Sequence, residues 1–174
     1  MRLARRNVLL VCGILMLVLG ALCIWFYLRA ANTQKQKWGS IVCRVNVTIL
    51  SLACSEHAEQ HGNTLPTKLS DLRPYLPTAL QRLRTRSLDP YLKVWEAHGG
   101  PQEPFACPLA RGDIRPAYET VGAGRKIPDG NRSEISVIRE IEPNHNRNRG
   151  LYIGYLEGHI VYMDKLEWAS ALKR

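Results

Sequence analysis

Acidic residues are missing from the first 55 residues of this sequence. The chain of 174 residues contains 15 Asp and Glu residues, and the first of them is Glu56. Carboxylates inside a membrane segment are costly and usually serve a function, so this absence excludes one common kind of intramembrane site. Four of the 24 basic residues lie before residue 32, so the net charge of +9 falls to +5 for the remainder. That excess is too small to indicate a nucleic-acid partner.

Motifs that would indicate an enzyme or a cofactor site are also missing. The five cysteines form no CxxC and no Cys/His spacing of the kind that holds structural zinc. The run Gly122-Ala123-Gly124 is too short for a phosphate-binding loop. No serine or cysteine stands in a pattern that predicts a catalytic triad. The sequence therefore favours a non-catalytic protein without a cofactor.

The longest apolar stretch runs from Val8 to Leu28, twenty-one positions without a charged side chain. A helix of this length measures about 30 Å, which matches the hydrocarbon core of a bilayer. Only a helix satisfies the backbone hydrogen bonds of such a segment in lipid. We therefore expect a cytoplasmic tail over residues 1–7 and a transmembrane helix over residues 8–28.

A cleaved signal peptide is the alternative interpretation of this stretch. A cut after Ala30 would place the bulky Leu28 at the −3 position, where a small residue is preferred. Three arginines and the α-amine precede the span, and three basic residues follow it closely, a slight positive-inside bias. We expect an uncleaved, single-pass anchor in the inner (cytoplasmic) membrane, with the amino terminus in the cytoplasm and an extracytoplasmic head.

The helical pattern continues past the membrane segment. Apolar residues recur at steps of three and four between Trp38 and Ala53, which predicts one apolar face of a helix. Gly62 is a typical stop signal for this helix. Residues 29–62 are thus expected to form an amphipathic continuation that offers its apolar stripe for docking. Its polar, opposite face is expected to carry Lys37, Arg44, Asn46, Ser51 and Ser55.

Residues 63–174 are expected to form a small α+β head. Short helices are predicted after Pro66 and Pro77, a turn over residues 87–91, and a last helix from Asp164. Strands are predicted over residues 116–121 and 135–141, followed by a hairpin whose turn is Glu157-Gly158. The predicted fold class is α+β, with a long amino-terminal helix packed against a small antiparallel sheet.

Three cysteines, Cys43, Cys54 and Cys107, belong to the expected head. A Cys54–Cys107 or a Cys43–Cys107 bridge is compatible with an oxidising compartment. The odd number and the irregular spacing favour free, buried thiols instead.

Two patterns could supply metal ligands. The oxygen spacing of a calcium loop is approximated by Asp129, Asn131, Ser133 and Glu140. Glu134, however, occupies the position where such a loop requires glycine. His57 and His61 lie one helical turn apart and could bind zinc, but the spacing of the remaining histidines and carboxylates does not identify a third ligand. We therefore expect a turn and a solvated helix end at these places, with no bound metal.

Several short runs together resemble the pilin and pseudopilin group of bacterial envelope proteins, the subunits of type IV pili and type II secretion systems. They are the apolar segment that leads into residues 43–61, the run His61–Leu72, and the late run Gly150–Ile160. The resemblance implies a pilin-like fold and assembly with other subunits or secretion components. The processing site of true pilins, Gly followed by Phe-x-x-x-Glu, is missing, so peptidase processing and polymerisation are not implied.

The sequence thus supports three functional hypotheses. The first is a single-span protein with a pilin-like head that acts by assembly with pilin-like subunits or secretion components, with the lipid bilayer as its other partner. The second is a membrane-tethered module that binds a ligand or metal without forming a filament. An enzyme is the third and the least favoured, because no acid–base pair or nucleophile stands out.

Overall fold

The computed structural model describes residues 2–85, 89–97, 105, 118–128, 132–141, 150–164 and 167. The chain divides into two compact units, Met1–Lys37 and Trp38–Arg174. The helix α1 (Arg2–Gln60) contributes to both.

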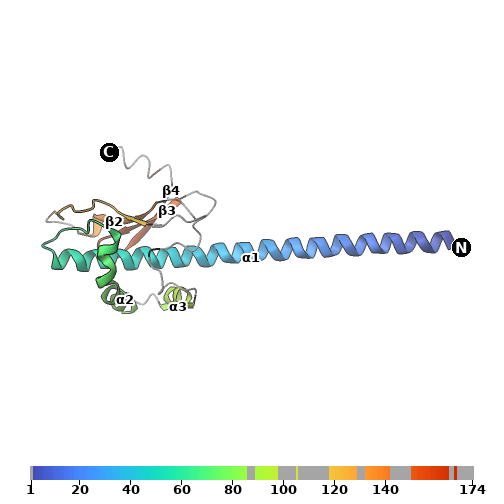
Figure 1. The fold of residues 1–174 in the computed structure, drawn as a ribbon, viewed down its shortest axis with the longest axis horizontal. Helices are drawn as coiled ribbons and strands as arrows, with labels where there is room; N and C mark the ends of the chain where they lie inside the picture. Colours follow the sequence, from blue (N-terminus) through green and yellow to red (C-terminus); the bar gives the residue numbers. More distant parts are fainter. Residues whose placement is uncertain are drawn as a thin grey trace. The chain divides into compact units, whose positions relative to one another are not determined.

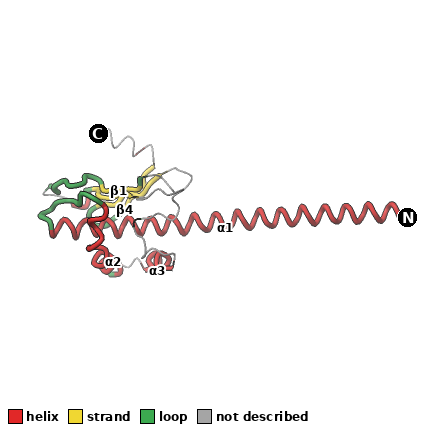
Figure 2. The backbone as a smooth tube through the Cα atoms, in the orientation of Figure 1, coloured by secondary structure: helices red, strands yellow, loops and turns green. Residues whose placement is uncertain are grey.

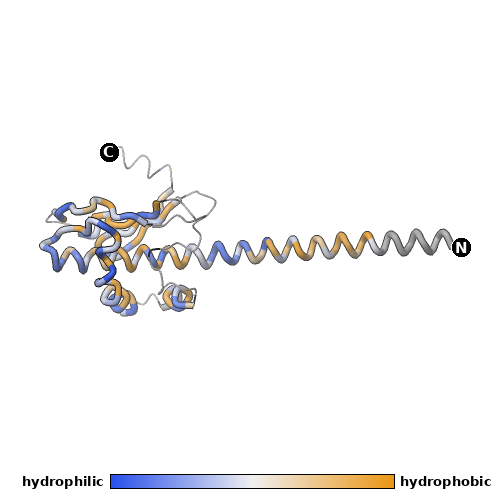
Figure 3. Tube along the Cα trace, viewed as in Figure 1, coloured by the Kyte–Doolittle hydropathy of each residue, from blue (hydrophilic) through white to orange (hydrophobic). Residues whose placement is uncertain are grey.

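The first unit consists of the amino-terminal part of α1. Its large apolar side chains between Ile14 and Leu28 are all exposed, from 46% for Leu22 to 75% for Leu17. Figure 3 shows this part of α1 as a mostly hydrophobic stretch. The helix is long and apolar enough here to cross a membrane, and a signal sequence near the amino terminus would have the same properties.

The second unit is built around residues 38–60 of α1. Figure 1 shows the sheet on one side of this helix segment and α2 and α3 on the other. The short helical elements are η1 (Leu69–Tyr75), α2 (Leu76–Arg84), α3 (Asp89–Ala97) and η2 (Arg132–Glu134). The strands are β1 (Tyr118–Thr120), β2 (Ser136–Glu140), β3 (Gly150–Tyr155) and β4 (Ile160–Asp164). The predicted α+β class, a long helix packed on a small antiparallel sheet, is confirmed.

The four strands follow one another in sequence order across the sheet, and each neighbouring pair is antiparallel (Figure 2). The β3–β4 hairpin turns at Gly158, whose φ of 82° suits glycine. The Gly158 amide donates a hydrogen bond to the Tyr155 carbonyl at 2.7 Å. This turn is the one that the Glu157-Gly158 pair predicts.

The carboxyl end of α1 also follows its sequence signal. Gly62 and Asn63 both have a φ of 61°, so the chain leaves the helix in the left-handed region. The Asn63 amide donates to the Ala58 carbonyl at 2.8 Å, which closes the last turn. The helix ends at Gln60.

The turn expected over residues 87–91 is wrong from Asp89 onward, because α3 begins there. Pro90 is compatible with this start, since the first turn of a helix does not use its amide. Leu92 and Trp95 lie three residues apart and are 4% and 2% exposed, so this short helix is held by its buried side. The last helix predicted from Asp164 falls almost entirely outside the described residues.

The expected polar face of α1 is also wrong within the second unit. Asn46, Ser51 and Ser55 are buried, as are all apolar residues of α1 between Val42 and Ala58. The sheet covers one side of the helix, and side chains of η1, α2 and α3 join the same core from the other. This segment therefore offers no free apolar stripe for docking.

Hydroxyl side chains tolerate this burial because they bond to their own helix. Ser51 donates a hydrogen bond to the Val47 carbonyl at 2.8 Å, and Thr48 donates to the Arg44 carbonyl at 3.0 Å. A polar residue that satisfies itself in this way can be enclosed on all sides without a large penalty. Polarity alone was thus a poor guide to exposure in this helix.

Candidate functional site

A buried polar network connects α1 to both layers that cover it. Asn46 is fully buried. The Trp95 indole N–H of α3 donates to its Oδ1 at 2.5 Å, and its Nδ2 donates to the Tyr118 hydroxyl of β1 at 3.3 Å. The Asn46 side-chain amide thus accepts a hydrogen bond from α3 on one side of α1 and donates one to the sheet on the other. This arrangement has a structural role, because it fixes the rotation of α1 between its two layers.

A second buried link joins α1 to the middle of the sheet. The Glu140 side chain on β2 is 1% exposed, and its Oε2 accepts the Tyr152 amide of β3 at 2.9 Å. The Tyr152 hydroxyl lies 2.8 Å from the Ser40 hydroxyl of α1. Burial raises the pKa of Tyr152. Glu140 is therefore engaged within the fold rather than directed into a solvent-facing loop.

Of the other calcium-loop candidates, the structure describes Ser133 alone. Ser133 lies in η2, whereas Asp129 and Asn131 lie outside the described residues. Among the residues that the structure describes, no group of three or more His, Cys, Asp or Glu side chains could hold a metal ion.

The two histidines at the end of α1 do lie together. The rings of His57 and His61 stack with their centroids 4.2 Å apart. His57 Nδ1 lies 3.1 Å from the Thr64 carbonyl, so this nitrogen donates, and His61 Nε2 lies 2.9 Å from the Tyr75 hydroxyl. Each imidazole therefore uses one nitrogen to tie the end of α1 to the chain that follows it.

Of the two head cysteines that the structure describes, Cys54 is the free, buried thiol that the sequence favoured and Cys43 is not. Cys43 is disulfide-bonded, so that expectation is wrong for it. Cys54 is free and buried, and burial raises the pKa of its thiol. This state of Cys54 rules out a Cys54–Cys107 bridge. Cys107, the partner in both alternatives, lies outside the described residues.

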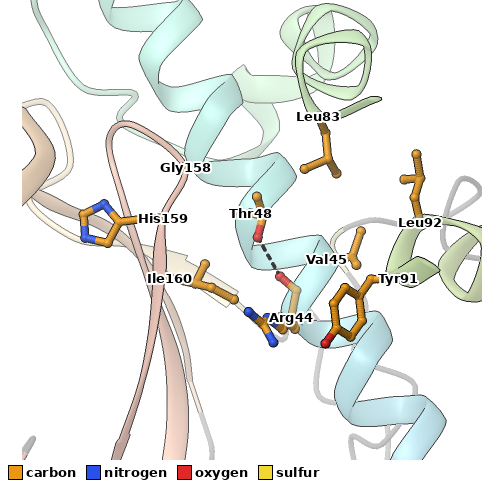
Figure 4. Close-up of a pocket in the computed structure, with 9 residues that line it drawn as sticks. All are labelled: Arg44, Val45, Thr48, Leu83, Tyr91, Leu92, Gly158, His159 and Ile160. Atoms are coloured by element: carbon orange, nitrogen blue, oxygen red, sulfur yellow. Dashed lines mark hydrogen bonds between the residues drawn. The ribbon is translucent and has the colours of Figure 1, made fainter. Parts of the chain in front are cut away.

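A pocket of about 250 Å³ lies between α1, α2, α3 and the β3–β4 hairpin (Figure 4). Arg44 of α1 lines it, with its guanidinium 5.1 Å from the centroid of the Tyr91 ring. We call this hollow the Arg44 pocket. It is lined by Arg44, Val45, Thr48, Leu83, Tyr91, Leu92, Gly158, His159 and Ile160.

Sequence reasoning missed this pocket. It assigned Arg44 to the polar face opposite the apolar stripe, whereas the side chain is half-buried between elements from four separate parts of the chain. The only sequence signal was an arginine at a position flanked by apolar residues of a helix that becomes a core element. Such a signal cannot locate the walls that α2, α3 and the hairpin supply.

No protein-family model, curated protein or solved structure matches this chain.

The buried hydroxyl of Tyr118 predicts a loss of stability at alkaline pH. Burial, reinforced by Glu140, raises its pKa well above the ordinary value of 10. Unfolded chains release this proton near pH 10, whereas the folded state keeps it, so the free energy of unfolding falls as pH rises above 10. Each such group contributes a slope of about 1.4 kcal/mol per pH unit. Urea unfolding between pH 8 and 11 measures this slope.

Tyr118→Phe tests the origin of that slope. The variant should lose about 1.4 kcal/mol per pH unit of the dependence above pH 10, because phenylalanine has no proton to release. Tyr162→Phe is the matched control, because that ring belongs to the head and is 41% exposed. An unchanged slope in Tyr118→Phe would contradict the assignment.

Proposed function

We propose that this protein is a single-span membrane protein of a bacterial envelope, with a pilin-like extracytoplasmic head, that acts by assembling with other proteins. Its partners would be similar subunits or secretion components. The proposal rests on the observation that α1 has two roles. Its first part exposes an apolar segment long enough to cross a membrane, and residues 38–60 form the core helix of an α+β head.

The disulfide of Cys43 supports an extracytoplasmic position for the head. Disulfides persist in oxidising compartments and are rare in the cytosol of most organisms. The slight charge bias around residues 8–28 points to the same orientation. Two independent features thus agree on a cytoplasmic amino terminus.

The span is the surface through which we expect assembly to occur. The apolar side chains of α1 between Val42 and Ala58 are already covered by the head itself. The exposed apolar side chains between Ile14 and Leu28 are not covered by any described part of the chain. Helices in a bilayer associate through close packing of such side chains.

Photo-crosslinking from the span tests this proposal. A photoreactive amino acid is placed at Leu22, Cys23, Ile24 or Trp25, four exposed positions that together sample every side of a helix. Irradiation of native membranes should give protein adducts strongly at one or two of these positions, because a packed span has one contact face. Gel analysis with mass spectrometry identifies each adduct as a second copy or as another protein.

Irradiation after solubilisation in excess detergent is the control, since it separates spans that meet only by collision. Adducts that survive dilution and keep their dependence on position indicate a stable contact. Exclusively lipid adducts, or protein adducts of equal yield at all four positions, would refute assembly through the span.

A further inference from the structure

We propose that the Arg44 pocket binds a small organic monocarboxylate with a compact apolar body. This inference concerns the head alone and does not depend on the proposed assembly of the span. It rests on an arginine that has no acidic partner among the described residues, on the apolar walls around it and on the size of the hollow.

The charge of Arg44 is not neutralised by the described part of the head. Its guanidinium lies over the Tyr91 ring, and no Asp or Glu side chain of the described residues pairs with it. Three other arginines of the head do pair with glutamates, namely Arg82, Arg84 and Arg139. A half-buried arginine stays charged and loses part of its hydration, so it favours an anionic partner.

The Arg44 guanidinium lies within cation–π distance of the Tyr91 ring. A guanidinium is planar and carries its N–H donors along its edge, where they match the two oxygens of a carboxylate. Figure 4 shows the guanidinium between Ile160 and Tyr91, at one end of the lining residues. A carboxylate there would be bound in a place partly shielded from water.

The remaining walls are suited to an apolar body. Val45, Leu83 and Leu92 are at most 5% exposed, and Ile160 is packed partly against the same core. A volume of about 250 Å³ lies just below the usual range of about 300–1,000 Å³ for ligand pockets, which limits the ligand to a few carbon atoms beyond the carboxylate.

A phosphate group fits the lining less well than a carboxylate. The Thr48 hydroxyl already donates its proton to the Arg44 carbonyl. His159 stacks on Tyr155 with ring centroids 4.4 Å apart, and its ring is directed away from Arg44 in Figure 4. Among the lining residues Arg44 is thus the one cation that faces the hollow, which suits a single negative charge.

Ligand-observed saturation-transfer NMR on the full chain in nanodiscs tests the proposal, with hexanoate as the probe and empty nanodiscs as the blank. Hexanoate should bind at least about tenfold more tightly than hexanamide, which has the same body without the charge, because a charged hydrogen-bonded pair is lost. Acetate should bind more weakly than hexanoate, because it leaves the apolar walls unfilled. Both comparisons use the unaltered protein.

Arg44→Gln should weaken hexanoate binding at least about tenfold and leave hexanamide binding unchanged. Arg73→Gln is the matched control, because Arg73 also lies over an aromatic ring, that of Phe105, but does not line the pocket. Circular dichroism checks that both variants keep their helix content. Equal binding of hexanoate and hexanamide, equal binding by wild type and Arg44→Gln, or no binding of hexanoate to the wild type would each overturn the assignment.

Discussion

Gly154→Val is expected to destabilise the head by about 3 kcal/mol or more, because no side chain fits between β3 and α1 at this position. A Cβ atom on residue 154 would overlap Ser51 Oγ and would lie 2.8 Å from Val47 Cγ1. Both of these residues belong to the core segment of α1 and are buried. The strand and the helix would have to separate, and the surrounding core would lose its packing.

Gly154→Ala makes the same change with a single carbon atom and should cost about 1–3 kcal/mol. Removing the overlapping hydroxyl with Ser51→Ala should recover part of this loss, so the two substitutions should couple by about 1 kcal/mol or more. Urea unfolding of the full chain in detergent micelles, followed by tryptophan fluorescence, measures these free energies.

Gly20→Ala is the matched control for this series. A Cβ atom at Gly20 meets nothing within 4 Å, and alanine favours the helix more than glycine does. Its free energy of unfolding should not fall. Wild-type stability in Gly154→Val would contradict the close contact between β3 and α1.

Asn46→Leu is expected to lower the free energy of unfolding by about 2–4 kcal/mol. The substitution removes the acceptor of the buried Trp95 N–H and the donor to the buried Tyr118 hydroxyl. Each group left without a partner in the core costs about 1–3 kcal/mol, whereas leucine keeps the branched shape and the number of non-hydrogen atoms of asparagine. Urea unfolding at pH 7 measures the loss.

A compensated variant separates hydrogen bonding from packing at this site. Asn46→Leu combined with Trp95→Phe and Tyr118→Phe also removes the indole N–H and the phenol hydroxyl that the single substitution leaves unpaired, so part of the stability should return. Asn32→Leu, at an exposed position of the first unit, should have little effect and serves as the control. A single Asn46→Leu variant as stable as the wild type would show that the network contributes nothing.

The parts of the fold that the sequence predicted correctly have local causes. The three- and four-residue period continues past the membrane segment, and α1 accordingly extends to Gln60. Glu157-Gly158 provides the backbone freedom that a tight hairpin needs, and the turn lies there. Neither feature depends on distant residues, so each can be inferred from a short window of sequence.

The features that the sequence predicted wrongly depend on contacts between distant segments. The burial of Asn46 requires Trp95 and Tyr118, which lie 49 and 72 residues further along the chain. The disulfide state of Cys43 likewise depends on how the chain folds back. The hydrophobic period of α1 shows where its apolar residues lie. It does not show which distant elements bury the polar residues of this helix.

The contacts between α1 and the sheet join residues that are far apart in the sequence, which affects the order of folding. Residues 42–58 of α1 leave the ribosome well before β1–β4, yet the partners of Ser40 and Asn46 include Tyr152 and Tyr118. Closing such large loops is entropically costly and slow. During biogenesis this part of α1 therefore remains uncovered by the sheet until β1–β4 have been synthesised.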